Sequence, residues 1–405
     1  MPVRCDRDGR GGIPMKLMLS GNEAAAHGAR IARAEVISAY PITPQTKIVE
    51  KLADFVASGE MKTEFIKVES EHSAMAACIS ASLVGARTFT ATSSQGLLLM
   101  HEMLHWASGS RTPIVMVNIN RAVAPPWSVW ADHTDSIAQR DTGWIQYYCE
   151  SCQEVVDTLI QAYKVCEHES VRMPAMLSED AFYLSHTSEP VDLPEQDEVD
   201  AFLGTYEPEH TLDVDDPRSF GSLTMPHQWY FEFRYKMAEG MERARSRIIE
   251  VDEEFGRIFG RSYGGMLELY RCDDAETVIV AAGSMSSTIR EAVDRYREEG
   301  KKIGLARLRV FRPFPRDELR ALASRVSRLI VLDRSFCFGN EGAFHNEIKA
   351  ALFDLEDRPE VRGYVIGIGG RDVTLDTIDT VVKRGEGNPE MNVLDTWVGL
   401  RRCEQ

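Results

Sequence analysis

Short apolar runs alternate with amphipathic stretches along the first two fifths of the chain. The runs predict strands near residues 36–40, 65–68, 88–92 and 113–119, and the stretches predict helices near 23–34, 45–56, 72–83 and 97–107. The strand candidates are mostly apolar or β-branched and do not alternate regularly with polar residues. That pattern is typical of a parallel sheet covered by helices on both faces, so we predict an α/β fold.

The remaining chain predicts a break and then a second α/β block. Periodicity stops from Ser188 to about Pro226, a stretch rich in Pro, Asp and Glu, and a long charged helix follows over Tyr230–Ile249. Strand candidates return at residues 277–282, 302–308, 329–333 and 364–368. We therefore predict a disordered tail over 1–15, a first domain over 16–187, a linker arm and long helix over 188–259, and a second domain over 260–405.

Composition narrows the class of protein. The 405 residues include 63 acidic and 46 basic ones, a formal net charge of −17, which disfavours nucleic-acid binding. No stretch approaches the roughly 18 apolar residues that a membrane span needs, and the basic first residues precede no apolar core. Eight cysteines are scattered along the chain, which favours reduced thiols. We expect a cytoplasmic protein.

Three motifs provide only weak evidence for a metal or nucleotide site. Cys149 and Cys152 form one isolated Cys-x-x-Cys pair, for which we favour structural thiols over a metal site. His101 and His105 stand one residue further apart than the pattern of zinc metalloproteases, and we expect no metal on this chain. The glycine-rich run 367–370 lacks the third glycine of a dinucleotide fingerprint and predicts a tight turn.

Two segments that follow predicted strands carry candidate chemistry. Pro41 and Pro44 stiffen a loop that holds the Thr43 hydroxyl at the carboxyl end of a strand, where open α/β sheets bind ligands; a plain rigid turn is the alternative. Glu71 falls in the first turn of a helix whose expected N-cap is Ser70. Alternatively, Glu69 and Glu71 only complement the helix dipole.

Two further strand ends are candidates for binding. Ser94 and Gln95 begin a helix whose free N–H groups could hold an anion or a polar ring, although simple capping is the alternative. Arg121 ends a strand before a proline-stiffened loop and could be a fixed cation for a carboxylate or a surface arginine. In that loop, Trp127 and Trp130 indicate a buried lid or a subunit contact.

Four segments in order resemble one family. They are Gly21–Ala25, Tyr40–Thr46, Glu69–Ala74 and Ser94–Met100. Together with the stretch after Arg121 they are similar to the alpha subunit of pyruvate:ferredoxin oxidoreductase and its 2-ketoisovalerate relatives, within the 2-oxoacid:ferredoxin oxidoreductase family. The resemblance is densest before Gly143.

The resemblance implies a thiamine-diphosphate site in the first domain. The first domain would be the pyrimidine-binding domain, and the second would be of the transketolase C-terminal type. Glu71 would hydrogen-bond the aminopyrimidine ring and so promote loss of the thiazolium proton. Thr43 and Arg121 would contact the substrate, and we expect Pro41, Ser94 and Gln95 to contact the cofactor.

The resemblance also implies partner subunits. The chain has no Gly-Asp-Gly segment of the kind that holds the metal of thiamine diphosphate, so Mg and the 4Fe-4S clusters are expected on beta, gamma and delta subunits. The implied reaction is oxidative decarboxylation of pyruvate with coenzyme A to acetyl-CoA, CO2 and reduced ferredoxin, in anaerobic metabolism. A branched-chain 2-oxoacid enzyme or a non-catalytic scaffold subunit are the alternatives.

Overall fold

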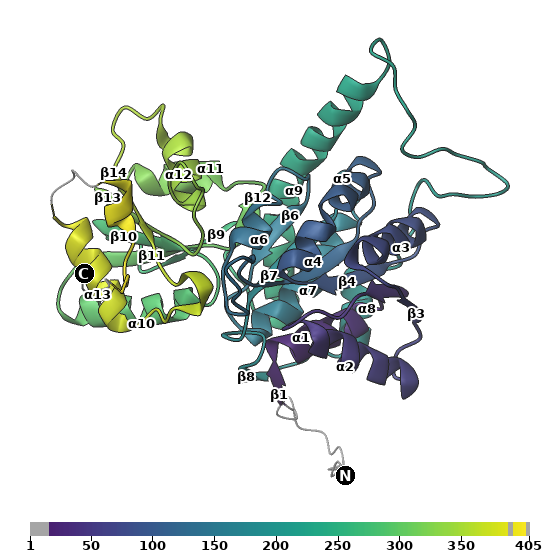
Figure 1. Cartoon of the computed structure of the whole chain (residues 1–405), viewed down its shortest axis with the longest axis horizontal. Coiled ribbons are helices and arrows are strands. Elements are labelled where there is room, and N and C mark those ends of the chain that lie inside the picture. The colour runs from purple at the N-terminus through teal and green to yellow at the C-terminus, as the bar shows by residue number, and fades with distance from the viewer. Residues whose placement is uncertain (1–15, 388–391, 402–405) are drawn as a thin grey trace.

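The larger of two main sheets takes strands from both halves of the chain. The structure is a computed structural model that describes residues 16–387 and 392–401 (Figure 1). In spatial order this sheet contains β12 (Val310–Arg312), β6 (Ile145–Tyr148), β7 (Ala175–Asp180), β5 (Val115–Asn120), β4 (Thr88–Thr92), β2 (Val36–Ala39) and β3 (Glu64–Lys67). All its pairings are parallel except that of β12 with β6. The predicted parallel sheet is confirmed.

Helices cover both faces of this sheet (Figure 1). One face packs against α1 (Gly21–Ile31), α2 (Thr46–Ala57) and α7 (Cys152–Cys166), and the other against α3 (Glu71–Leu83), α4 (Ser94–Leu99) and α5 (His101–Gly109). The small residues of α3 allow close packing, because Ala74 and Cys78 are fully buried beside β2 and β4. This small-faced helix therefore packs directly on the sheet.

The second sheet forms a smaller α/β unit. Its order is β14 (Glu360–Val365), β13 (Arg328–Asp333), β10 (Thr277–Ala281), β11 (Ile303–Leu308) and β9 (Leu267–Tyr270), with only β9 antiparallel. Its helices are α10 (Met285–Glu298), α11 (Arg316–Ala323), α12 (Ala343–Leu352) and α13 (Leu375–Gly385), with 3-10 turns at Ile368–Gly370 and Val393–Thr396. Gly367, Gly369 and Gly370 all have positive φ, as the predicted tight turn requires.

The structure corrects several predicted elements. The helix predicted over 97–107 is two helices, α4 and α5, which meet at Met100. The stretch from Ser188 contains β8 (Ser188–Val191), paired with β1 (Leu17–Ser20), and α8 (Gln196–Leu203). Sequence reasoning missed these elements because each is short and surrounded by proline and acidic residues. The predicted tail lies outside the described residues.

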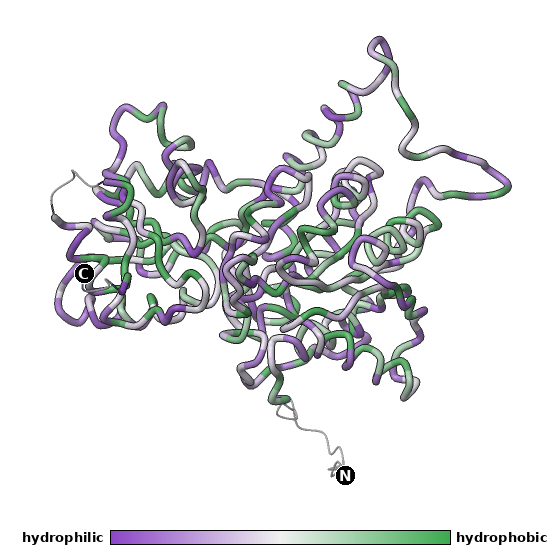
Figure 2. The backbone as a smooth tube through the Cα atoms, viewed as in Figure 1, coloured by the Kyte–Doolittle hydropathy of each residue, from purple (hydrophilic) through white to green (hydrophobic). Residues whose placement is uncertain are grey.

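An arm precedes the long helix α9 (Tyr230–Phe259), which runs ten residues beyond its predicted end at Ile249. Residues 204–229, which we call the arm, contain no helix or strand long enough to be named. Figure 1 shows the arm and the first turns of α9 projecting away from both sheets, and Figure 2 shows apolar positions along them. Val214, Leu223 and Phe231 are 94%, 89% and 80% exposed. None of the described helices is both long enough and apolar enough to cross a bilayer.

A buried ionic cluster joins the two α/β units. Arg307 of β11 is 1% exposed and donates to Glu268 at 2.6 Å and to Glu154 of α7 at 2.8 Å. Glu150 lies 3.2 Å from Arg307 and also accepts two hydrogen bonds from Arg290 of α10. We call these five side chains the interdomain cluster. Because each carboxylate faces a guanidinium, the buried charges are compensated within the chain.

Candidate functional site

Four loops meet at one edge of the larger sheet. Strands β5, β4, β2 and β3 are neighbours and run parallel, so their carboxyl ends lie at the same edge. After these ends, Arg121 and Thr43 lie in loops, and Ser94 and Glu71 are the first residues of α4 and α3. The fold therefore gathers all four predicted segments, which are separated by up to 80 residues of sequence.

Arg121 is a buried cation at the centre of this edge. Its side chain donates to the Thr43 carbonyl at 2.5 Å from Nη1 and to the Gln95 side chain at 2.6 Å from Nη2. The residue is 5% exposed, and its Nε has no hydrogen-bond partner. Burial lowers the pKa of its guanidinium. Among the described residues no ion pair joins its guanidinium to a carboxylate, and the Asp135 carboxylate, which accepts the Arg121 backbone N–H, only partly offsets the effect of burial on that pKa.

Glu71 is a buried acid close to the start of α4. It is the first residue of α3, where the Ser70 hydroxyl caps the helix by accepting from the Ser73 N–H. The residue is 7% exposed, and a Cβ added at Gly96 would lie 2.6 Å from its Oε1. Among the described residues no hydrogen bond reaches its carboxylate. Glycine at position 96 therefore makes room for this acid.

Glu69 has a different environment from Glu71. Its side chain is exposed and accepts a hydrogen bond from Ser73 at 2.6 Å, and that bond lowers the pKa of the Glu69 carboxyl. A side chain in this position stabilises the first turn of the helix. Of the two acids, only Glu71 is buried and faces the loops of the neighbouring strands.

The turn at Ser94 and Gln95 is held in an uncommon backbone conformation. Ser94 has φ of 49°, and its hydroxyl approaches both the Ala122 carbonyl and the Gln95 side-chain oxygen at 2.7 Å. Gln95 thereby orients the Arg121 side chain, and its Nε2 stays buried without a partner. This function of Gln95 was not foreseen from sequence, which indicated only a helix start.

Thr43 and Pro41 are exposed at the same edge. Thr43 contacts Arg121 through its backbone carbonyl and not through its hydroxyl. The adjacent Pro44 carbonyl accepts from the Asn22 side chain of α1 at 2.9 Å, which ties the loop to that helix. The hydroxyl of Thr43 therefore stays available at the surface of the site, as a substrate contact requires.

The loop after Arg121 leaves its tryptophans accessible. Trp127 is 77% and Trp130 is 45% exposed, so the expected buried lid is wrong within this chain. A subunit contact remains the prediction for Trp127. Trp130 packs beside Phe182 and against Gly370 of the second α/β unit, which fixes the base of the loop.

Among the described residues, the other flagged motifs form no hydrogen bond or ion pair with Arg121 or Glu71. Cys149 and Cys152 are buried free thiols, and burial raises the pKa of both. His101 Nδ1 lies 2.6 Å from Gln139, and His105 contacts the His101 ring. No grouping of three or more potential metal ligands occurs in the described part of the chain.

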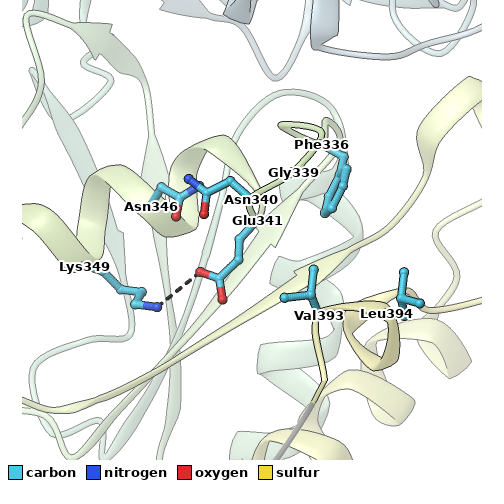
Figure 3. Close-up of a pocket in the computed structure, with 8 residues that line it drawn as sticks. All are labelled: Phe336, Gly339, Asn340, Glu341, Asn346, Lys349, Val393 and Leu394. Carbon is cyan, nitrogen blue, oxygen red and sulfur yellow. Dashed lines mark hydrogen bonds and ion pairs between the residues drawn. The ribbon is translucent and has the colours of Figure 1, made fainter.

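A concave region lies in the second α/β unit (Figure 3). It has a volume of about 550 Å³ and lies between the loop after β13 and the last 3-10 turn, with Phe336 and Val393 on its walls. Its acid and base, Glu341 and Lys349, pair with each other at 3.1 Å. Because its charges are already paired, it lacks the uncompensated groups found around Arg121.

Comparison with known families matches both parts of the chain. Residues 27–253 match the thiamine-diphosphate-binding domain of pyruvate flavodoxin/ferredoxin oxidoreductases, and residues 275–378 match core domain II of pyruvate:ferredoxin oxidoreductase. A ketoisovalerate oxidoreductase subunit VorA from Pyrococcus horikoshii is 52% identical over 96% of this chain and 99% of its own length. A pyruvate synthase subunit PorA from Methanothermobacter thermautotrophicus is 50% identical over 95% of this chain and 98% of its own length.

A solved structure supports the same fold. The 2-oxoglutarate:ferredoxin oxidoreductase from Magnetococcus marinus superposes with a TM-score of 0.67 at 19% identity, over 91% of this chain and 65% of that one. The predicted α/β thiamine-diphosphate-binding fold is confirmed. With two matching domains and full-length relatives at about half identity, the chain belongs to the alpha subunits of the 2-oxoacid:ferredoxin oxidoreductase family.

Proposed function

We propose that this chain binds a small 2-oxoacid and the aminopyrimidine ring of thiamine diphosphate in an enzyme that oxidises pyruvate. The 2-oxoacid loses CO2, its acyl group is transferred to coenzyme A, and its electrons pass to oxidised ferredoxin. The observation that carries this proposal is the buried, uncompensated guanidinium of Arg121. A buried charge without a partner is costly, so a bound anion would stabilise this site.

The geometry of Arg121 suits a carboxylate. A guanidinium has five N–H donors in a fixed fork, and the protein acceptors Thr43 and Gln95 use one from each terminal nitrogen. The Nε–H and the second hydrogen of a terminal nitrogen remain for two oxygens of one carboxylate. The Thr43 segment contains no second cation, so a monocarboxylate fits better than a dicarboxylate such as oxalate.

Glu71 suits the proposed cofactor. A buried carboxylate without a hydrogen-bond partner can accept from a ring N–H, and Pro41, Ser94 and Gln95 lie in the loops around it. When bound, thiamine diphosphate supplies the stabilised carbanion that decarboxylation requires. Glu71 would hydrogen-bond the aminopyrimidine ring, and Arg121 would orient the substrate carboxylate. Retention of such an acid also argues against a scaffold without cofactor.

The substrate needs a direct test, because the relatives include both ketoisovalerate and pyruvate enzymes at similar identity. Steady-state kinetics of the assembled complex on pyruvate, 2-ketoisovalerate, 2-oxoglutarate and oxalate, with ferredoxin or viologen as acceptor, would decide between them. We expect pyruvate to have the highest kcat/KM, with 2-ketoisovalerate as the second candidate. Thiamine diphosphate absent from the purified active complex would contradict the proposal.

The partners follow from the same assignment. Both relatives are named as subunits, and we infer beta, gamma and delta partners that supply Mg, the diphosphate half of the site and the 4Fe-4S clusters, in the cytoplasm. The arm and the first turn of α9 support such contacts, because Trp229, Phe231 and Phe233 are more than half exposed. Exposed apolar surface of this kind marks protein interfaces. The isolated folded chain should therefore show no turnover.

A further inference from the structure

A fully buried aspartate links two of the loops that form the site. Asp135 lies in the short helix α6 (Thr134–Ile137), behind the loops after β4 and β5. Its Oδ2 accepts from the backbone N–H of Ser94 at 2.9 Å, the backbone N–H of Arg121 at 3.2 Å and the Asn118 side chain at 3.2 Å. Its Oδ1 accepts from the Ser136 N–H at 2.7 Å. One carboxylate therefore holds both loops by their backbones.

These contacts decide where the Arg121 guanidinium points. A serine with positive φ costs roughly 1–2 kcal/mol relative to the right-handed region, and the Ser94 N–H donates to Asp135 from that conformation. The turn places the Gln95 side chain where it accepts from Arg121 Nη2. Asp135 thus fixes the backbone of Arg121 directly and its side chain indirectly.

The carboxylate holds Arg121 without neutralising it. Asp135 accepts the backbone N–H of Arg121, and no ion pair forms between the two side chains. A direct ion pair would compete with a substrate carboxylate for the same guanidinium hydrogens. Burial raises the pKa of Asp135 to about 7, while the N–H donors around it lower that pKa.

We propose that Asp135 is a positioning residue that sets the Gln95–Arg121 pair for the substrate carboxylate. This inference rests on the proposed function of Arg121 as the carboxylate-binding group. Asp135 itself touches neither substrate nor cofactor. Its removal should therefore weaken binding of the anionic substrate more than binding of the cofactor.

The test uses Asp135→Asn, Arg121→Ala and the double variant in the assembled complex. We expect Asp135→Asn to raise the KM for pyruvate by roughly tenfold, the loss of hydrogen bonds to a charged acceptor, with a smaller change in kcat. The inhibition constant of the uncharged ester methyl pyruvate should be unchanged, and the affinity for thiamine diphosphate should change less than the KM for pyruvate. The double variant should have the KM of Arg121→Ala alone, because Asp135 acts through Arg121.

The matched control is Asp132→Asn. Asp132 is also buried and accepts the Thr134 N–H at 2.7 Å, but it contacts neither Ser94 nor Arg121. The Asp132→Asn variant should have the same KM for pyruvate as the unmodified enzyme. If Asp135→Asn does not fold, Asp135→Glu keeps the charge while displacing both loops, and should raise KM in the same way.

The outcomes separate the two proposals. An unchanged KM in Arg121→Ala would overturn the function of Arg121, and this inference with it. A raised KM in Arg121→Ala with an unchanged KM in Asp135→Asn would overturn only the positioning by Asp135. Fully additive effects in the double variant, or an equal weakening of methyl pyruvate binding, would also overturn it.

Discussion

Two buried arginines of this chain have opposite surroundings. Arg307 in the interdomain cluster has three carboxylates within 4 Å, from Glu150, Glu154 and Glu268. Arg121 at the sheet edge has neutral acceptors, Thr43 and Gln95, and an unpaired Nε. Both side chains are almost inaccessible, at 1% and 5% exposure, so burial alone does not distinguish them.

We interpret the difference as one between a structural charge and a charge that we propose to be functional. Arg307 exchanges its hydration for carboxylates supplied by the chain, and the surrounding acids raise the pKa of its guanidinium. Arg121 lacks such compensation, and burial lowers the pKa of its guanidinium. A compensated arginine holds two α/β units together, whereas an uncompensated one leaves binding energy for a ligand. Glu71 is the acidic counterpart of Arg121, since it too is buried without a partner.

The largest effect is expected for Glu71→Gln. This change keeps the side-chain volume but removes the carboxylate that we assign to the aminopyrimidine ring. Turnover of the complex should fall by roughly 10² to 10⁴, the usual contribution of an acid–base group, and cofactor affinity should fall less. Pre-steady-state and steady-state kinetics would measure turnover, and titration with thiamine diphosphate would measure cofactor affinity.

Glu69→Gln is the control for this prediction. Glu69 is two residues away, exposed, and bonded only to Ser73. It should retain nearly full turnover. Near-normal activity in Glu71→Gln, or an equal loss in Glu69→Gln, would mean that the buried acid is not the activating group.

The next effect should appear in stability and not in catalysis. Arg307→Met keeps much of the side-chain volume but removes a cation shared by three carboxylates. Glu154 would then keep only Arg309, at 3.4 Å, and Glu268 only Arg290, at 2.7 Å. The free energy of unfolding should fall by about 3–5 kcal/mol, the cost of removing one partner from a buried pair. Urea denaturation followed by circular dichroism would measure it.

Arg243→Met is the matched surface variant. Arg243 pairs with Glu239 on α9, and its side chain is 53% exposed, so its loss should cost below about 0.5 kcal/mol. A loss in Arg307→Met no greater than in Arg243→Met would show that the interdomain cluster does not hold the two units together.

Arg121 should show a smaller effect that falls mainly on KM. Arg121→Ala should cost about 2–5 kcal/mol in kcat/KM, the range for truncating one partner of a buried charged pair. Arg121→Lys keeps the charge but loses the paired hydrogen bonds to Thr43 and Gln95. We expect it to raise KM by roughly tenfold, which corresponds to the loss of about one hydrogen bond made by a charged group. Unfolding free energies of both variants should stay near the unmodified value, in contrast to Arg307→Met.

The sequence predicted the site segments better than their internal contacts. Thr43, Glu71, Ser94 and Arg121 could be found because each follows an apolar strand, and parallel strands bring their carboxyl ends to one edge. The contact of Gln95 with Arg121 could not be found, because it depends on the positive φ of Ser94 and on Asp135, 40 residues further along the chain. Side-chain orientation of this kind is fixed by tertiary packing.

The fold shows the same division. Long periodic elements such as α2, α3 and α9 were predictable from their own residues. In contrast, β12 was missed because it has three residues and pairs with β6 of the first α/β unit. Its place in the larger sheet depends on how the two units dock, which no local pattern encodes. The interdomain cluster was missed for the same reason, since its arginines and glutamates come from distant segments.

The smallest effect is expected for Cys149 and Cys152. Both thiols are buried, with raised pKa values, whereas cluster ligation needs thiolates. Cys152 instead donates to the Thr187 carbonyl at 3.4 Å, beside the start of β8, as a structural thiol does. Replacing both with Ser should leave the iron content and the electron-transfer rate of the complex unchanged, by elemental analysis and viologen reduction, with at most a modest loss of stability. Loss of about four irons per complex, the content of one 4Fe-4S cluster, would instead place an iron–sulfur centre on this chain and give it a part of the electron relay.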